Sequence, residues 1–191
     1  MSKSRMEAFS DGVLAIIITI MVLELAIPHE VDLAALRPLI PIFLSYVLSF
    51  VFLGIYWNNH HHLMQAAQRI DGRVLWANLH LLFWLSLIPF VTGWMGENNF
   101  ATLPVALYGT VLLFAAIAYF ILSRSLLSIH EQDSALAIAL GQDSKAKLSL
   151  VIYIVAIPLA FANPWLSCAL FALVAIMWLV PDRRIEKTLT S

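Results

Sequence analysis

The sequence predicts an all-α membrane protein with six transmembrane helices. Hydrophobic residues make up 61% of the 191 residues, and charged residues make up only 12%. The mean hydropathy of +0.87 lies outside the range of soluble domains. Apolar runs long enough to cross a bilayer recur along the chain. We therefore expect one six-helix transmembrane domain over residues 1–191, with the lipid bilayer as its solvent.

The six predicted spans follow one another, and the longest connection is the cytoplasmic segment between the fourth and fifth. They cover about residues 6–27, 38–60, 73–95, 103–126, 147–162 and 165–180. The first run is too long for a signal peptide and lacks a small-residue cleavage site. Pro89 and Pro158 lie inside the third and fifth spans, where each predicts a local kink. Only Asn163 and Pro164 separate the last two spans, which predicts a tight helical hairpin.

The basic residues predict the orientation of these spans. With the N terminus inside, 10 of the 11 Lys and Arg residues fall on the cytoplasmic side, and only Arg37 falls outside. Cytoplasmic loops of membrane proteins carry such an excess of positive charge. We therefore expect a multi-pass protein of the cell membrane with both termini in the cytoplasm.

The sequence argues against several other functional classes. A net charge of −1 with scattered basic residues gives no surface for nucleic acid. The chain has no GxSxG, HExxH or Walker motif, so we expect no enzyme, no catalytic residue and no cofactor. His60, His61 and His62 are adjacent and point about 100° apart on a helix, which favours a polar collar over a metal site.

The first span combines polar residues with an apolar stripe. Ser10 and Asp11 lie inside it beyond Arg5 and need polar partners, because burying unpaired polar groups in a membrane is costly. Asn78 and His80 lie at a matching depth in the third span. Further along, Ile16, Ile20 and Leu23 have the i, i+4, i+7 spacing of one helix face. This spacing alone does not separate a pore lining from ordinary helix packing.

The segment "RMEAFSDGV" at residues 5–13 resembles a known signature. It matches the Arg-x-x-x-Phe-Ser-Asp pattern that opens the first helix of the transmembrane protein 175 family of potassium channels. The similarity continues in "YWNNHHHLM" and in "LWANLHLLFWLSLIPFVTGWMGE". It extends over essentially the whole length of the prokaryotic members, which have one six-helix repeat.

This resemblance implies a homotetramer whose four first helices line a central pore permeable to potassium ions. It implies no TVGYG filter, and the sequence contains none. The matching positions of the hydrophobic constriction are Ile16, Ile20 and Leu23, and Thr19 matches a polar layer between these rings. We expect the motif and its partners to hold the first helix at a fixed rotation, through Arg5, Phe9, Ser10, Asp11, Asn78 and His80.

Two alternatives remain open from the sequence. Glu24 follows Leu23 by one residue, so its carboxylate either faces the pore and attracts cations or faces a neighbouring helix. The protein is either a passive channel or a proton-coupled secondary transporter in which Asp11 and His80 relay protons. A purely structural membrane protein is a third interpretation, which only the absence of catalytic motifs favours.

Overall fold

The computed structural model describes residues 2–29, 31–130 and 144–179, and the regular elements in these ranges are all helices. Helix α1 (Lys3–Leu23) is followed by a 3-10 helix, η1 (Leu33–Leu39), which leads directly into α2 (Ile40–Ala66). The next helices are α3 (Gly72–Ser86), α4 (Ile88–Glu97) and α5 (Thr102–Leu127). Helices α7 (Ser144–Leu159) and α8 (Pro164–Leu179) complete the described part.

Three of these helices have a short polar residue as their N-cap. The Ser2 hydroxyl accepts a hydrogen bond from the Arg5 amide at the start of α1, over 3.4 Å. Asp32 caps η1 and Asp71 caps α3, each through its Oδ1 atom at 3.0 Å from a backbone N–H. Such caps satisfy amide groups that have no partner inside the helix, and they fix where each helix begins.

Within the described residues, four helical stretches are long and apolar enough to cross a membrane: α1, η1 with α2, α3 with α4, and α5. Helix α8 is a shorter apolar helix. Helices α7 and α8 pack against each other and form the predicted hairpin, with Asn163 Oδ1 accepting a hydrogen bond from the Trp165 amide in the turn. The count of six membrane spans remains a prediction.

Helices α1 and α2 end farthest from their predicted positions. Helix α1 ends at Leu23 instead of Ile27, because the ring of a proline at position 28 clashes in a helix with the carbonyl four residues before it, at Glu24. Helix α2 continues past His60 to Ala66. Hydropathy underestimates its length, since polar residues (His61, His62 and Gln65) interrupt the apolar run beyond His60 but are compatible with a helix. The described part of the last span ends at Leu179, so residue 180 lies outside it.

The two prolines inside predicted spans act differently. Pro89 interrupts the third span, which is split into α3 and α4 with Leu87 between them, in agreement with the predicted kink. Proline has no N–H to donate and is well accommodated in the first turn of a new helix. Pro158 instead lies in the last turn of α7, one residue before the helix ends at Leu159.

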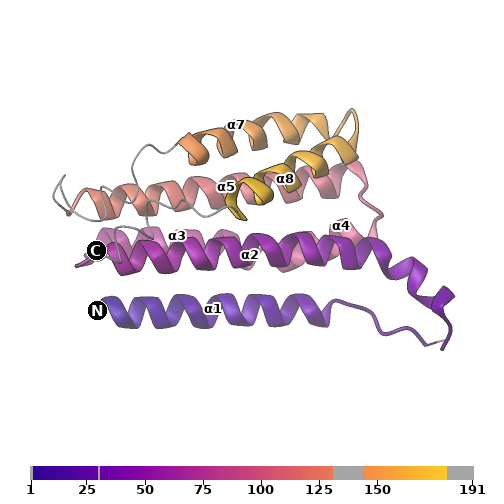
Figure 1. Ribbon diagram of the computed structural model, residues 1–191, viewed down its shortest axis with the longest axis horizontal. Coiled ribbons are helices and arrows are strands. Elements are labelled where there is room, and N and C mark those ends of the chain that lie inside the picture. Colours follow the sequence, from indigo (N-terminus) through magenta and orange to yellow (C-terminus); the bar gives the residue numbers. More distant parts are fainter. Residues whose placement is uncertain (1, 30, 131–143, 180–191) are drawn as a thin grey trace.

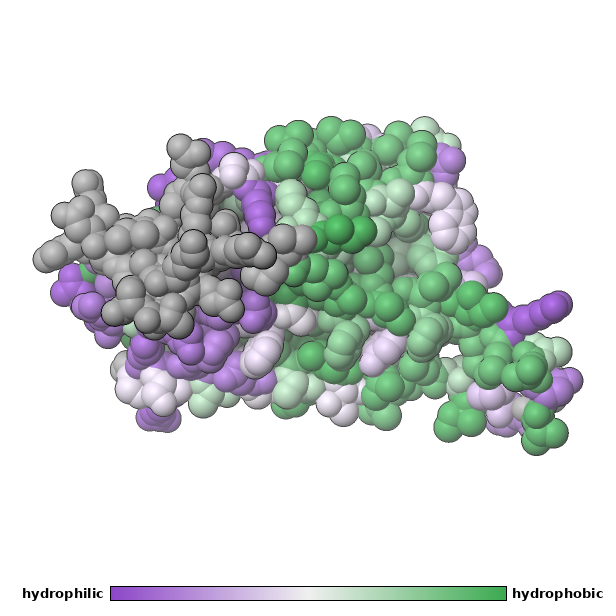
Figure 2. All heavy atoms as spheres, in the orientation of Figure 1, coloured by the Kyte–Doolittle hydropathy of each residue, from purple (hydrophilic) through white to green (hydrophobic). Residues whose placement is uncertain are grey.

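The helices lie side by side, with α1 along one edge of the bundle (Figure 1). Helix α1 packs against α2, α3 and α4. Helices α7 and α8 lie on the opposite side and pack against α5. On the face in Figure 2 a broad apolar band covers the middle of the bundle, and hydrophilic residues gather towards the end that holds the N terminus. The pore helix expected from the sequence is thus a peripheral helix of the single chain.

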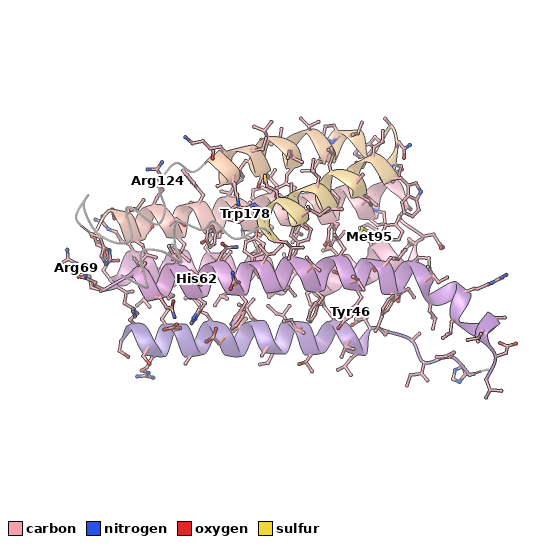
Figure 3. The ribbon with its side chains drawn as sticks, in the orientation of Figure 1. Tyr46, His62, Arg69, Met95, Arg124 and Trp178 are labelled. Carbon is pink, nitrogen blue, oxygen red and sulfur yellow. The ribbon has the colours of Figure 1, made fainter. Side chains whose placement is uncertain are left out.

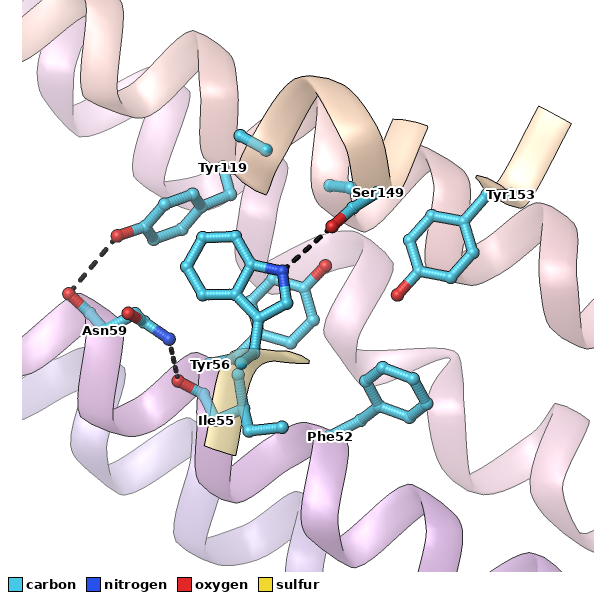
Figure 4. A pocket seen from close by; sticks show the side chains of 10 residues that line it. Phe52, Ile55, Tyr56, Asn59, Tyr119, Ser149 and Tyr153 are labelled. Atoms are coloured by element: carbon cyan, nitrogen blue, oxygen red, sulfur yellow. Dashed lines mark hydrogen bonds between the residues drawn. The ribbon is translucent and has the colours of Figure 1, made fainter. Parts of the chain in front are cut away.

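A small cavity of about 40 Å³ lies among α2, α5, α7 and α8. Figure 4 shows its aromatic lining and two of the hydrogen bonds that close it. The indole N–H of Trp178 donates to Ser149 Oγ over 2.9 Å, and the Tyr119 hydroxyl donates to the Asn59 carbonyl over 3.3 Å. None of the residues that line this cavity belongs to α1.

Candidate functional site

Helix α1 has one buried face and one exposed face. The buried face packs against the bundle and consists of Met6, Ser10, Leu14, Ile17 and Met21. On the side next to this face, about 110° around the helix, the three expected constriction residues are accessible in the single chain, with exposed fractions of 61% for Ile16, 42% for Ile20 and 76% for Leu23. We call Phe9, Ile16, Ile20 and Leu23 the exposed face of α1.

The other expected residues of this face are exposed as well. Phe9 is half exposed and stands two turns before Ile16. Thr19 is exposed, and its hydroxyl donates to the Ala15 carbonyl of the same helix over 2.8 Å. Arg5 is also exposed, close to the N-terminal end of α1. The exposed face is therefore apolar through the middle of the helix, with a basic residue at its start.

A groove of about 570 Å³ runs between α1 and α4. Ile16, Ile20 and Glu24 line one side, and the α4 residues Phe90 and Glu97 are among those that line the other. The Glu24 carboxylate lies against α4, since a Cβ atom on Gly93 would be 3.7 Å from Glu24 Oε2. Within one chain, Glu24 thus faces a neighbouring helix and shares a groove with two of the expected constriction residues.

The buried polar residues of α1, α2 and α3 form a network. Asn78 Nδ2 donates to Ser10 Oγ over 2.9 Å, and Asn78 Oδ1 lies 2.8 Å from His60 Nε2. All three residues are at least 98% buried. Because the amide oxygen accepts, His60 carries its proton on Nε2. We call Ser10, Asn78 and His60 the Ser10 network; it contains the Ser10–Asn78 pair expected from depth.

Asp11 has a partner on α2 and not on α3. The indole N–H of Trp57 donates to Asp11 Oδ1 over 3.0 Å. The Trp57 ring stacks on His61, with ring centroids 5.9 Å apart. The His61 Nδ1 atom lies 3.5 Å from Glu7 Oε1. The expectation that Asn78 or His80 would pair with Asp11 is therefore wrong, because Asp11 is rotated about 100° from Ser10 and faces α2.

His80 lies outside this cluster. It is on the exposed face of α3, and its Nε2 atom accepts a hydrogen bond from the Trp84 indole over 2.9 Å. Trp84 in turn stacks on Phe114 of α5, with ring centroids 4.5 Å apart. The structure therefore does not bring His80 together with Asp11, and it lacks the geometry of the expected proton relay.

His60 belongs to the site, although its adjacency to His61 and His62 at the end of the second predicted span indicates a polar collar. Ser49, Phe52 and Leu53 are buried on the same helix, and Leu53 stands seven residues before His60. Continuing this helical period through His60 would have placed it on the buried face.

Comparison with known proteins agrees with this architecture. The family model described as the endosomal/lysosomal potassium channel TMEM175 matches residues 5–89. A Chryseobacterium protein (strain P1-3) named as a potassium channel is 51% identical over 99% of this chain and 98% of its own length. The chain belongs to the TMEM175 family. The matched region contains both the exposed face of α1 and the Ser10 network.

A solved TMEM175 structure has the same fold. The crystal structure of a lysosomal potassium-selective channel TMEM175 homolog from Chamaesiphon minutus matches with a TM-score of 0.73 and 26% identity, over 93% of this chain and 96% of that one. The rat protein named endosomal/lysosomal proton channel TMEM175 is 29% identical over 92% of this chain, which spans only 40% of its length. TMEM175 relatives thus carry names for both potassium and proton conduction.

Proposed function

We propose that this TMEM175 chain forms a passive cation channel permeable to potassium ions. The observation that carries the proposal is the similarity over 99% of the chain to a protein named as a potassium channel. The exposed apolar face of α1 supports it, because Ile16, Ile20 and Leu23 stay 42–76% exposed in the single chain although α4 borders the groove beside them.

In the proposed assembly four copies surround a central axis, with α1 of each copy facing that axis. The chain lies in the cell membrane with both termini in the cytoplasm, as the distribution of basic residues predicts. Ile16, Ile20 and Leu23 then form three apolar rings along the pore, and Thr19 adds hydroxyl groups between them. The Glu24 carboxylates lie in the groove beside α4, so they attract cations to the surroundings of the outer mouth and form no ring on the pore axis.

An apolar constriction offers an ion no ligands in place of water. A narrow ring therefore closes the pore by dewetting, and a wider ring passes partly hydrated cations. Potassium gives up part of its hydration shell at a lower cost than sodium, so such a ring favours potassium modestly. The Ser10 network and the Asp11–Trp57 bond hold α1 at the rotation that directs these rings to the axis.

Substitution of the ring residues tests this proposal. Leu23→Asn or Ile16→Asn places an amide in the constriction, and the amide supplies ligands to a dehydrating sodium ion. We expect the reversal potential between potassium and sodium solutions to move toward zero in reconstituted liposomes. Val22→Asn, on an exposed position next to the rings, is the matched control. Unchanged selectivity in every ring variant would contradict the proposed constriction.

The proton-coupled transporter is the competing function, and the separation of Asp11 from His80 gives it no support. Recordings from the reconstituted protein distinguish the two functions. A channel gives unitary currents that follow the electrochemical gradient. Saturable transport with a fixed proton stoichiometry and no unitary current would exclude the channel.

A further inference from the structure

The first turn of α1 contains a second attachment that lies outside the Arg-x-x-x-Phe-Ser-Asp motif. Lys3 Nζ donates hydrogen bonds to the carbonyl oxygens of Met64 and Ala67, both over 2.9 Å. Met64 lies in the last turn of α2, and Ala67 is its C-cap residue. The ammonium group of the pore helix thus caps the C-terminal end of its neighbour.

The chemistry of this contact favours a dedicated role for Lys3. The last carbonyls of a helix have no partner within the helix and carry partial negative charge, so a cation bound to them is stabilising. In the first turn of its own helix, the same cation meets the positive end of the dipole and is disfavoured. The first turn of α1 contains no acidic residue to offset it. The two bonds to α2 therefore compensate an unfavourable local placement.

Lys3 and Asp11 attach α1 to α2 at two heights. Eight residues separate them, or about 12 Å along the helix. Beyond Asp11, no side-chain hydrogen bond joins α1 to another helix in the part of the chain that the structure describes; Thr19 bonds only within α1. The apolar side chains of the buried face hold the remainder of α1 against the bundle. Lys3 is the polar attachment closest to the N-terminal end, and it constrains the tilt of α1 from that end.

We propose that Lys3 is a positioning residue that sets the tilt of α1 and thereby the width of the constriction. This inference rests on the proposed channel function. Leu23 lies about 18 Å beyond Asp11, so a pivot of about 5° at Asp11 moves Leu23 by about 1.5 Å. A change of that size alters a ring through which partly hydrated ions pass.

The loop that receives Lys3 is itself held from a second side. His130 Nε2 accepts a hydrogen bond from the Gln68 amide over 3.0 Å, and Arg69 Nε donates to the Ile129 carbonyl over 2.8 Å. Figure 3 shows Arg69 at the end of the bundle that also holds the start of α1. Lys3 therefore binds next to a loop that is hydrogen-bonded to the residues after α5. These bonds restrict the movement of the carbonyl groups that receive Lys3.

The test compares the full-length wild-type protein with Lys3→Met, Lys3→Arg and Lys3→Met/Ser4→Lys in liposomes. The double variant keeps the charge but moves it about 100° around α1, away from the α2 carbonyls. We expect Lys3→Met and the double variant to shift the potassium–sodium reversal potential toward zero, with the elution volume of the assembly unchanged. Lys3→Arg retains the wild-type potential, since its guanidinium donates to the same carbonyls.

The outcomes distinguish a role of the Lys3 hydrogen bonds from a role of its positive charge alone, and both from a failure of the proposed channel function. A wild-type reversal potential in Lys3→Met, or its restoration by Ser4→Lys, overturns the inference, because charge alone would then suffice. If Lys3→Met fails to assemble, the double variant, which has the native charge, is used in its place. A wild-type reversal potential in the double variant then overturns the inference. A wild-type protein that carries no potassium current would refute the channel function itself, independently of these variants.

Discussion

At the scale of single residues, Asn78 joins three helices through one amide group. Its nitrogen donates to Ser10 of α1 and its oxygen accepts from His60 of α2, while its own backbone belongs to α3. Each of the two hydrogen bonds is buried in the bundle. A buried network of this kind favours one rotation of the helices over its neighbours, because any other rotation leaves a polar group without a partner.

Replacement of Asn78 tests this role. Asn78→Ala removes the donor to Ser10 and the acceptor for His60, and each buried group left unpaired costs about 1–3 kcal/mol. We expect a clearly lower melting temperature for the detergent-solubilised protein. Asn98→Ala is the control, since that exposed amide bonds only to the Trp94 carbonyl of the preceding turn. Equal melting temperatures for the two variants would argue against the network.

The sequence identifies part of this network and misassigns the rest for a geometric reason. Depth offers Asn78 or His80 as partners for Ser10 and Asp11, and in the structure Asn78 pairs with Ser10. Asn78 and His80 are two residues apart, however, and point about 200° apart on a helix, so they do not both face α1. Depth gives the height of a side chain in the membrane but not its direction. Helical phase supplies the direction once the packing partners of α3 are known.

At the scale of helices, Gly96 allows α4 to approach α2 closely. A Cβ atom at this position would lie 2.7 Å from the Ile42 Cα atom and 2.5 Å from Ser45 Oγ. Contacts this short with backbone force the helices apart. Because α4 also packs against α1, this close approach helps to determine the position of the helix that carries the exposed face.

A one-methyl substitution tests the close approach. Gly96→Ala is expected to destabilise the protein by about 1–3 kcal/mol through overpacking. Gly54→Ala, in the interior of α2, meets no other atom within 4 Å and gains up to about 1 kcal/mol of helix propensity. Thermal unfolding of both variants in the same detergent should therefore show shifts of opposite sign. A Gly96→Ala protein as stable as the wild type would contradict the predicted clash.

The helices differ in how far the sequence predicts them. Hydropathy locates α5 to within one residue at each end, because its long apolar run is interrupted by a charged residue only at Arg124, in the last turn. The same criterion stops six residues short in α2, whose last turns contain polar residues. Pro89 correctly predicts the break between α3 and α4. To predict where a helix ends among polar residues, one needs to know its capping and packing contacts, which hydropathy does not contain.

At the scale of the whole molecule, the attachments of α1 are divided along its length. The polar contacts, from Lys3 to Asp11, gather at the N-terminal end, and the remainder of the helix packs through apolar side chains. One face of that remainder is open in the single chain. A helix fixed in rotation at one end and uncovered along one face is suited to meet other copies of itself.

Crosslinking between copies tests that arrangement. Cys168 is the one cysteine of the chain, so Cys168→Ser gives a background in which single cysteines are informative. In that background, Ile20→Cys places a thiol on the exposed face, whereas Ile17→Cys places it at a position where the native side chain is 97% buried within the same chain. If α1 lines a shared axis, a short thiol-reactive crosslinker joins Ile20→Cys chains into dimers in the membrane and leaves Ile17→Cys chains as monomers. The mobility of the chains on denaturing gels measures the yield. Equal yields for the two positions, or none for Ile20→Cys, would place the exposed face of α1 against lipid and exclude it from the pore.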